Sequence, residues 1–217
     1  MKNEKKESTT LYQKINTVSD WVIRLVMINI LVIITSLPLI TLFPSLSAGF
    51  KLFNQYVNHE EVKLFKNYFK YFAENFRKKL ILGLTLTIII ILGYINSTYY
   101  VDFLNQSVTW FYAFGYYVTL TLLIVALLVN LYALPVIMVT PHARIFLIFK
   151  FSLYLSGKFF LRTVLLFLTL SIPLVLLMIP QLYVVIVFSG ISLPILLNVI
   201  ISQPVINYIK DLISDEN

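Results

Sequence analysis

Long apolar stretches dominate the chain, and short polar segments separate them. Between positions 161 and 209 the only charged residue is Arg162. A run of about 18 or more apolar residues is long enough to cross the ~30 Å hydrocarbon core of a bilayer as a helix. The pattern predicts an all-α, polytopic helical membrane protein, with about five transmembrane helices plus interfacial amphipathic helices. The first three spans are predicted within the apolar stretches 22–42, 80–100 and 111–139, and the last two are predicted at 163–179 and 182–202.

The composition agrees with this class. Of the 217 residues, 59% are hydrophobic and 12% are charged, whereas about 25% of residues are charged in an ordinary soluble domain. Five spans of ~20 residues occupy about 100 positions, so we expect residues 1–217 to form a single integral membrane domain. The chain has no cysteine, which excludes disulfides and thiolate metal sites.

The distribution of basic residues predicts the orientation. Loops 43–79 and 141–162 contain 11 of the 17 Lys and Arg, whereas the short loop 101–109 contains none. An excess of Lys and Arg marks cytoplasmic loops, so we expect both basic loops and the C-terminus inside a bacterial cell membrane. The net charge of +7 then serves contact with anionic headgroups, and we expect no nucleic-acid partner.

Two features of the sequence favour opposite sides for the N-terminus. Five crossings place it outside, and we favour that side. Lys2, Lys5, Lys6 and Lys14 favour the inside instead. An inside N-terminus would require the segment 44–57 to return through the membrane, although as a helix it is only about 21 Å long.

A basic and aromatic stretch at 61–79 is the second informative feature. Four phenylalanines fall within ~60° of one another on a helix of ~100° per residue, and four basic residues lie on an adjoining arc. Such a helix is typical of a segment lying among lipid headgroups. The alternative is that the phenylalanines pack on neighbouring helices, and the two can hold together. The residues are Phe65, Phe69, Phe72 and Phe76, with Lys63, Lys66, Lys70 and Arg77.

Proline marks the expected breaks between spans, because it removes a backbone donor and clashes with the preceding turn. The sequence Leu37-Pro38-Leu39-Ile40 recurs as Leu134-Pro135-Val136-Ile137. We expect Pro38 and Pro135 to end their spans, Pro44 to begin the next helix, and Pro141 to follow the second break. The recurrence suggests two parallel halves, 11–100 and 110–180, with a last span at 182–203. Chance similarity is the alternative.

Polar residues within the spans are few. Asn29, Asn96, Asn130 and Asn198 are the main ones, and such residues can hydrogen-bond between helices. We favour this role over a substrate path. His59 and His142 lack ligand neighbours at metal-binding spacing, and no phosphate-binding glycine loop or paired acid and base is visible. We therefore predict no catalytic residue, no metal site and no cofactor.

The stretch from Ser36 to Ala48, with its Leu-Pro, Thr and Pro positions, resembles the YesL family. Asn29 and the Phe-rich basic run from Phe65 to Lys79 add to the resemblance. This is a family of small bacterial membrane proteins of unassigned function, often encoded beside sugar ABC transporters and polysaccharide-utilisation genes. The resemblance implies an accessory role in carbohydrate uptake or sensing, and supplies no active site.

The leading hypothesis is a non-enzymatic membrane protein that acts through partners, for example a sugar ABC transporter or a membrane sensor. The alternative is a small-solute transporter or channel subunit, which can be a homo-oligomer.

Overall fold

The computed structural model describes the backbone of residues 2–106 and 110–214, and the side chains of residues 16–103 and 110–214. The described part is all-helical, which confirms the predicted fold class. Positions 107–109 of the predicted outer loop lie outside the described residues. The α-helices are α1 (Lys2–Ser36), α2 (Leu42–Val57), α3 (Leu64–Ala73), α4 (Phe76–Gln106), α5 (Trp110–Val139), α6 (Ile145–Lys158), α7 (Phe160–Met178), α8 (Tyr183–Val185) and α9 (Ser192–Ser214).

Five of these helices contain segments long and apolar enough to cross a membrane, which confirms a multi-span membrane protein. The segments are Asn16–Ser36, Phe76–Phe103, Trp110–Val139, Phe160–Met178 and Ser192–Ser214. The middle three agree closely with the predicted spans. The first helix ends at Ser36, directly before Leu37-Pro38, which confirms the prediction that this proline ends the first span although the apolar run continues to 42.

The predicted last span, 182–202, is wrong in its bounds. Pro180–Leu182 is a short 3-10 helix, α8 follows it, and Ile186–Gly190 forms a π-helix. The long helix α9 begins only at Ser192 and continues to Ser214. The uniform apolar pattern of this region hides the break, which is held by a side chain from α1 described below.

Helix α2 is the centre of the fold, and packs against α1, α3, α4 and α9. Most of its residues are buried, and Phe50, Leu52 and Phe53 are fully so. Gly49 permits the close approach, since a Cβ there would lie 3.3 Å from Val32 and 3.4 Å from Ile195. Small residues at helix contacts are typical of membrane proteins, because they let helices pack closely.

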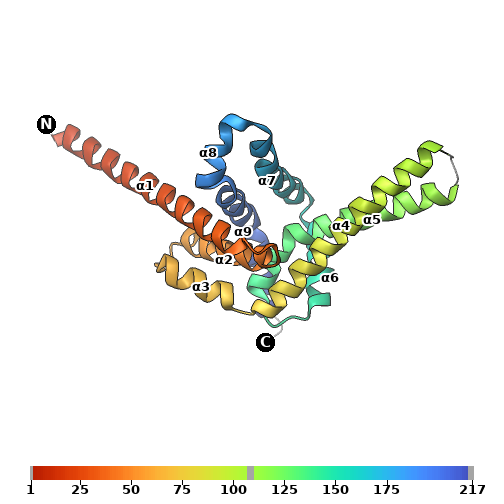
Figure 1. Cartoon of the computed structure of the whole chain (residues 1–217). Coiled ribbons are helices and arrows are strands. Elements are labelled where there is room, and N and C mark those ends of the chain that lie inside the picture. The colour runs from red at the N-terminus through yellow and green to blue at the C-terminus, as the bar shows by residue number, and fades with distance from the viewer. Residues whose placement is uncertain (1, 107–109, 215–217) are drawn as a thin grey trace.

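The α4–α5 hairpin extends away from this centre (Figure 1). Its outer half exposes large apolar side chains, including Ile91, Tyr94, Phe114 and Leu122. In water such a surface would be unfavourable, whereas lipid chains cover it at no such cost. The hairpin therefore supports the membrane assignment.

Candidate functional site

The predicted basic and aromatic helix at 61–79 is two helices. Helix α3 ends at Ala73, Asn75 adopts a left-handed conformation with φ 51°, and α4 begins at Phe76. Asn is among the residues that tolerate this conformation. Phe76 and Arg77 therefore belong to α4 rather than to the stripe on α3. The sequence pattern missed the turn because periodicity alone does not register a two-residue interruption.

The outward face of α3 combines aromatic and basic side chains. Phe65 is 53% and Phe69 50% exposed, and Lys66 and Lys70 are exposed beside them. Lys63 and Arg77 are exposed as well. Phe72 and Phe76 are half-buried instead, with ring centroids 5.4 Å apart. This face has the composition of an interfacial helix, and its contact with anionic headgroups stays a prediction.

The inward face of α3 consists of two tyrosines. The Tyr68 hydroxyl lies 2.7 Å from the Thr35 hydroxyl and 3.5 Å from the Ser45 carbonyl oxygen. Tyr68 is fully buried, and burial raises its pKa to about 12. Its anchoring role was not predicted, because at ~100° per residue Tyr68 lies beside the phenylalanine stripe, about 60° from Phe65.

The second inward tyrosine, Tyr71, connects α2, α3 and α4. Its hydroxyl donates to Gln55 Oε1 at 2.6 Å, and its backbone carbonyl accepts a hydrogen bond from Lys79 Nζ. Lys51 lies 2.7 Å from Glu74 and over the Tyr71 ring at 4.6 Å. Burial raises the pKa of Tyr71. These contacts fix α3 along the core.

The first Leu-Pro segment is a true break, as predicted. Leu37 and Pro38 lie between helices, and Pro38 is extended with φ −73° and ψ 106°. Thr41 donates to the carbonyls of Thr35 at 2.6 Å and Pro38 at 2.7 Å. The Pro38 carbonyl also accepts the Thr41 backbone N–H at 2.7 Å, so the side chain and the backbone of Thr41 together satisfy these two carbonyls. Pro44 lies in the first turn of α2, where a missing donor costs little.

The second Leu-Pro segment is not a break, and the prediction that Pro135 ends its span is wrong. Leu134 and Pro135 are buried inside α5, which continues to Val139. The helix ends at Thr140-Pro141, where a proline disfavours helical conformation at the residue before it. Lys78 donates to the Pro141 carbonyl at 2.6 Å, so the two predicted basic loops meet. The two Leu-Pro segments therefore have different structures, and the parallel halves stay a prediction.

Asn29 is fully buried and uses its whole hydrogen-bonding capacity. Its Nδ2 donates to the carbonyls of Ile186 at 3.0 Å and Val187 at 2.7 Å. Its Oδ1 accepts from the backbone N–H groups of Ile191 and Ser192, both at 2.9 Å. Asn29 thereby pairs backbone groups of the irregular segment before α9. Irregular backbone inside a bilayer requires such partners.

The other three asparagines have different surroundings. Asn198 is half-buried and accepts a hydrogen bond from Ser202 at 3.1 Å. Asn96 is exposed on the outer part of α4. Asn130 is half-buried in α5, and its side chain makes no hydrogen bond among residues 16–103 and 110–214. The structure does not gather the four asparagines into one site.

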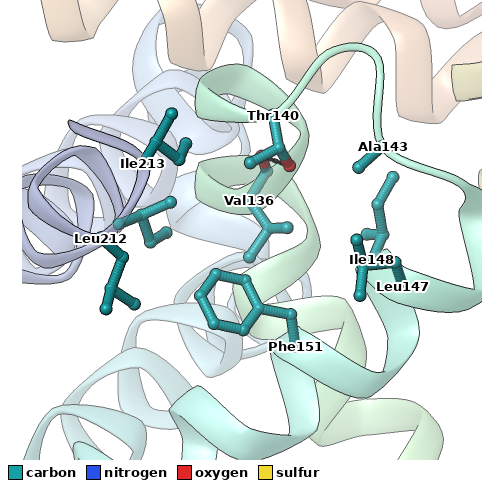
Figure 2. A pocket seen from close by; sticks show the side chains of 9 residues that line it. Val136, Thr140, Ala143, Leu147, Ile148, Phe151, Leu212 and Ile213 are labelled. Atoms are coloured by element: carbon teal, nitrogen blue, oxygen red, sulfur yellow. Dashed lines mark hydrogen bonds between the residues drawn. The ribbon is translucent and has the colours of Figure 1, made fainter. Parts of the chain in front are cut away.

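An apolar cavity of ≈ 270 Å³ lies between α5, α6 and α9. Figure 2 shows Val136, Phe151 and Leu212 around it, with Thr140 as its polar member. A more polar cleft of ≈ 480 Å³ lies between α2 and the ends of α5 and α9, and is lined by Lys51 and Glu60 among others. Within the described residues, no group of three or more His, Cys, Asp or Glu could hold a metal ion.

Comparison with known proteins adds one match. Residues 25–97 match the model of a family described as a protein of unknown function, DUF624. The matched stretch contains the first Leu-Pro break, α2 and α3, and ends within α4. No curated protein and no solved structure matches the chain. The chain is thus a multi-span membrane protein that is similar, over residues 25–97, to the DUF624 family.

Proposed function

We propose that this protein is a non-enzymatic component of the bacterial cell membrane that acts through protein partners. The carbohydrate part of the proposal, an accessory role in sugar uptake or sensing, comes from the resemblance to the YesL family. The observation that carries the partner-based role is that the Asn29 side chain is fully hydrogen-bonded within the chain. A polar residue that lines a substrate path needs free donors or acceptors, whereas all four positions of this amide bind the chain's own backbone.

Surfaces suited to partners lie at the ends of the helices. The α3 face offers Lys66 and Lys70 to anionic headgroups. The apolar cavity between α5, α6 and α9 lies near the same Thr140-Pro141 turn that Lys78 contacts. The contact between the two basic loops supports their placement on one side of the membrane. We assign that side to the cytoplasm.

Purification from native membranes in a mild detergent tests the proposal. We expect a transporter subunit or a membrane sensor to copurify in a fixed ratio with the tagged chain. The control is a variant with Phe151→Asp, which places a charge in the apolar cavity, and we expect it to lose the partner while it remains helical. A wild-type chain that purifies alone, from cells grown on the relevant carbohydrate, would contradict the partner-based role.

A transporter or channel subunit is the second candidate, and Asn130 favours it. An unpaired amide in a bilayer span is costly unless water, solute or another subunit supplies hydrogen bonds. Reconstitution of the purified chain into liposomes separates the candidates. Solute uptake that Asn130→Leu abolishes would favour transport, whereas the accessory role predicts no uptake by the chain alone.

A further inference from the structure

The beginning of the apolar part of α1 lies beside the polar segment after α2. The Arg24 guanidinium lies over the Tyr56 ring, 4.3 Å from its centroid. Asp20 and Arg24 line a cleft of ≈ 610 Å³ together with His59 and Glu60. Helix α2 therefore runs back along α1, and its end lies at the level of Arg24, while α1 continues beyond this level to Lys2 (Figure 1).

Helix α3 connects this level to the beginning of α4 without crossing the membrane. It has 10 residues, about 15 Å as a helix, which is half of the ~30 Å hydrocarbon core. Lys66 and Lys70 are exposed along it, which makes burial in lipid costly. The segment 58–63 and the beginning of α4 therefore lie on the same side of the membrane.

The turn between α1 and α2 has the chemistry of a segment surrounded by hydrocarbon. Leu37 is 74%, Leu39 84% and Ile40 54% exposed, whereas turns in water favour Gly, Asn, Asp and Ser. The hydroxyls of Thr41 and Ser45 donate to backbone carbonyls within this turn. Inside a bilayer, an irregular segment needs backbone groups that are hydrogen-bonded within the protein and apolar side chains that face the lipid.

The turn is also shallow. Phe43 packs directly against Gly83 of α4, which is seven residues after Phe76, or about 10 Å along the helix. Thr35, two residues before the turn, bonds Tyr68 of α3. The turn thus lies at the depth of Gly83, near the beginning of α4.

We propose that α1 and α2 form a re-entrant hairpin, whose apolar turn contacts the acyl chains of one leaflet. The membrane is then crossed four times, by α4, α5, α7 and α9, and both termini lie on the side of the basic loops. This topology replaces the five crossings expected from apolar length alone. It places Lys2, Lys5, Lys6 and Lys14 with the other cations, where five crossings would separate them.

Because the chain has no cysteine, single substitutions report accessibility without background. We would label Ser19→Cys and His59→Cys with a membrane-impermeant maleimide, in right-side-out and inverted vesicles. His142→Cys marks the basic side, and Asp102→Cys marks the opposite side. We expect both test positions to react from the same side as His142→Cys. Reaction of Ser19→Cys from the side of Asp102→Cys would overturn the proposal.

The turn is tested at Leu39, whose exposure means that substitution removes little packing. We expect Leu39→Cys to resist the reagent from both sides and to react fully after the membrane is dissolved in SDS. A fluorescent probe on this cysteine should be quenched by lipids brominated in the acyl chain. Reaction from either side of intact vesicles would place the turn in water and reject the hairpin, whatever partner the protein has.

Discussion

The segments 37–44 and 134–141 begin with nearly the same four residues and have opposite structures. At the first, Pro38 lies in an exposed break between two helices. At the second, Pro135 is buried in an unbroken helix. A proline therefore permits a break without determining one. The surroundings differ. Thr41 and Ser45 supply hydroxyls at the first segment, whereas Pro135 is buried within α5, a helix that packs against α4, α6 and α9.

The largest expected effect comes from Asn29, which precedes the first segment in α1. Asn130, which precedes the second segment in α5, serves as its comparison. Asn29→Leu removes all four hydrogen bonds between this side chain and backbone groups of the segment before α9. We expect a loss of about 3 kcal/mol in the free energy of unfolding, measured by SDS titration in mixed micelles. The matched variant Asn130→Leu should change it by less than about 1 kcal/mol. Equal losses would show that Asn29 does not stabilise the break before α9.

Alkaline pH should lower the free energy of unfolding, because it ionises Tyr68, whose hydroxyl bonds Thr35 just before the first break. Its pKa is raised to about 12 in the folded protein from an ordinary value of 10.0. The neutral phenol is therefore favoured by folding, and its stabilisation is complete below pH 10 and is lost as the pH rises towards 12. Two pKa units correspond to about 2–3 kcal/mol. Circular dichroism with SDS titration at pH 9 and pH 11.5 would measure this loss.

Tyr68→Phe should remove most of this pH dependence, whereas Tyr94→Phe, at an exposed position on α4, should retain it. A pH dependence that is unchanged in Tyr68→Phe would assign the alkaline loss to other groups. The contacts of Tyr68 with Thr35 and Ser45 would then be less important to the first break than its burial suggests.

A third comparison uses one threonine from each segment. Thr41→Val removes the only side-chain donor to the Thr35 carbonyl among the described residues, and we expect a loss of about 1–2 kcal/mol. Thr140→Val removes a bond to the Val136 carbonyl, which already accepts the Thr140 backbone N–H at 2.8 Å. Its loss should be below about 0.5 kcal/mol. The same micelle titration serves both variants, and a larger effect at Thr140 would reverse the assignment.

Sequence alone predicts what depends on local apolar length. The fold class and the spans of α4, α5 and α7 follow from runs that lipid must cover. The ends of α9 and the fate of Pro135 depend on contacts with distant residues, which a pattern does not contain. Asn29 is 157 positions from Ile186, so no window of sequence reveals that it supports the break there.

In the candidate site, too, the spacing of residues predicts the exposed face but not the features that depend on packing between helices. The basic and aromatic residues of α3 could be identified from spacing, and four of them are exposed as an interfacial face requires: Phe65, Phe69, Lys66 and Lys70. The turn at Asn75 and the anchoring by Tyr68 depend on how α3 packs on α2. The re-entrant topology proposed for α1 rests on the contact of Arg24 with Tyr56, which apolar length does not predict.

The smallest expected effect compares two glycines. Gly83 of α4 faces the first segment, whereas Gly157 of α6 faces open space. A Cβ at Gly83 would collide with Phe43, which directly follows the first break. Gly157 in α6 has nothing within 4 Å of such a Cβ. Alanine improves helix propensity by about 1 kcal/mol at both positions, but the collision at Gly83 costs about 1–3 kcal/mol.

We therefore expect Gly157→Ala to raise the free energy of unfolding by about 0.5–1 kcal/mol, and Gly83→Ala to lower it by about 1 kcal/mol. Combining Gly83→Ala with Phe43→Gly should restore the propensity gain relative to Phe43→Gly alone, because the colliding atom is the Phe43 Cβ, which glycine lacks. If Gly83→Ala stabilises the protein on its own, the turn between α1 and α2 does not rest on α4. The shallow depth inferred for the hairpin would then lose its main support.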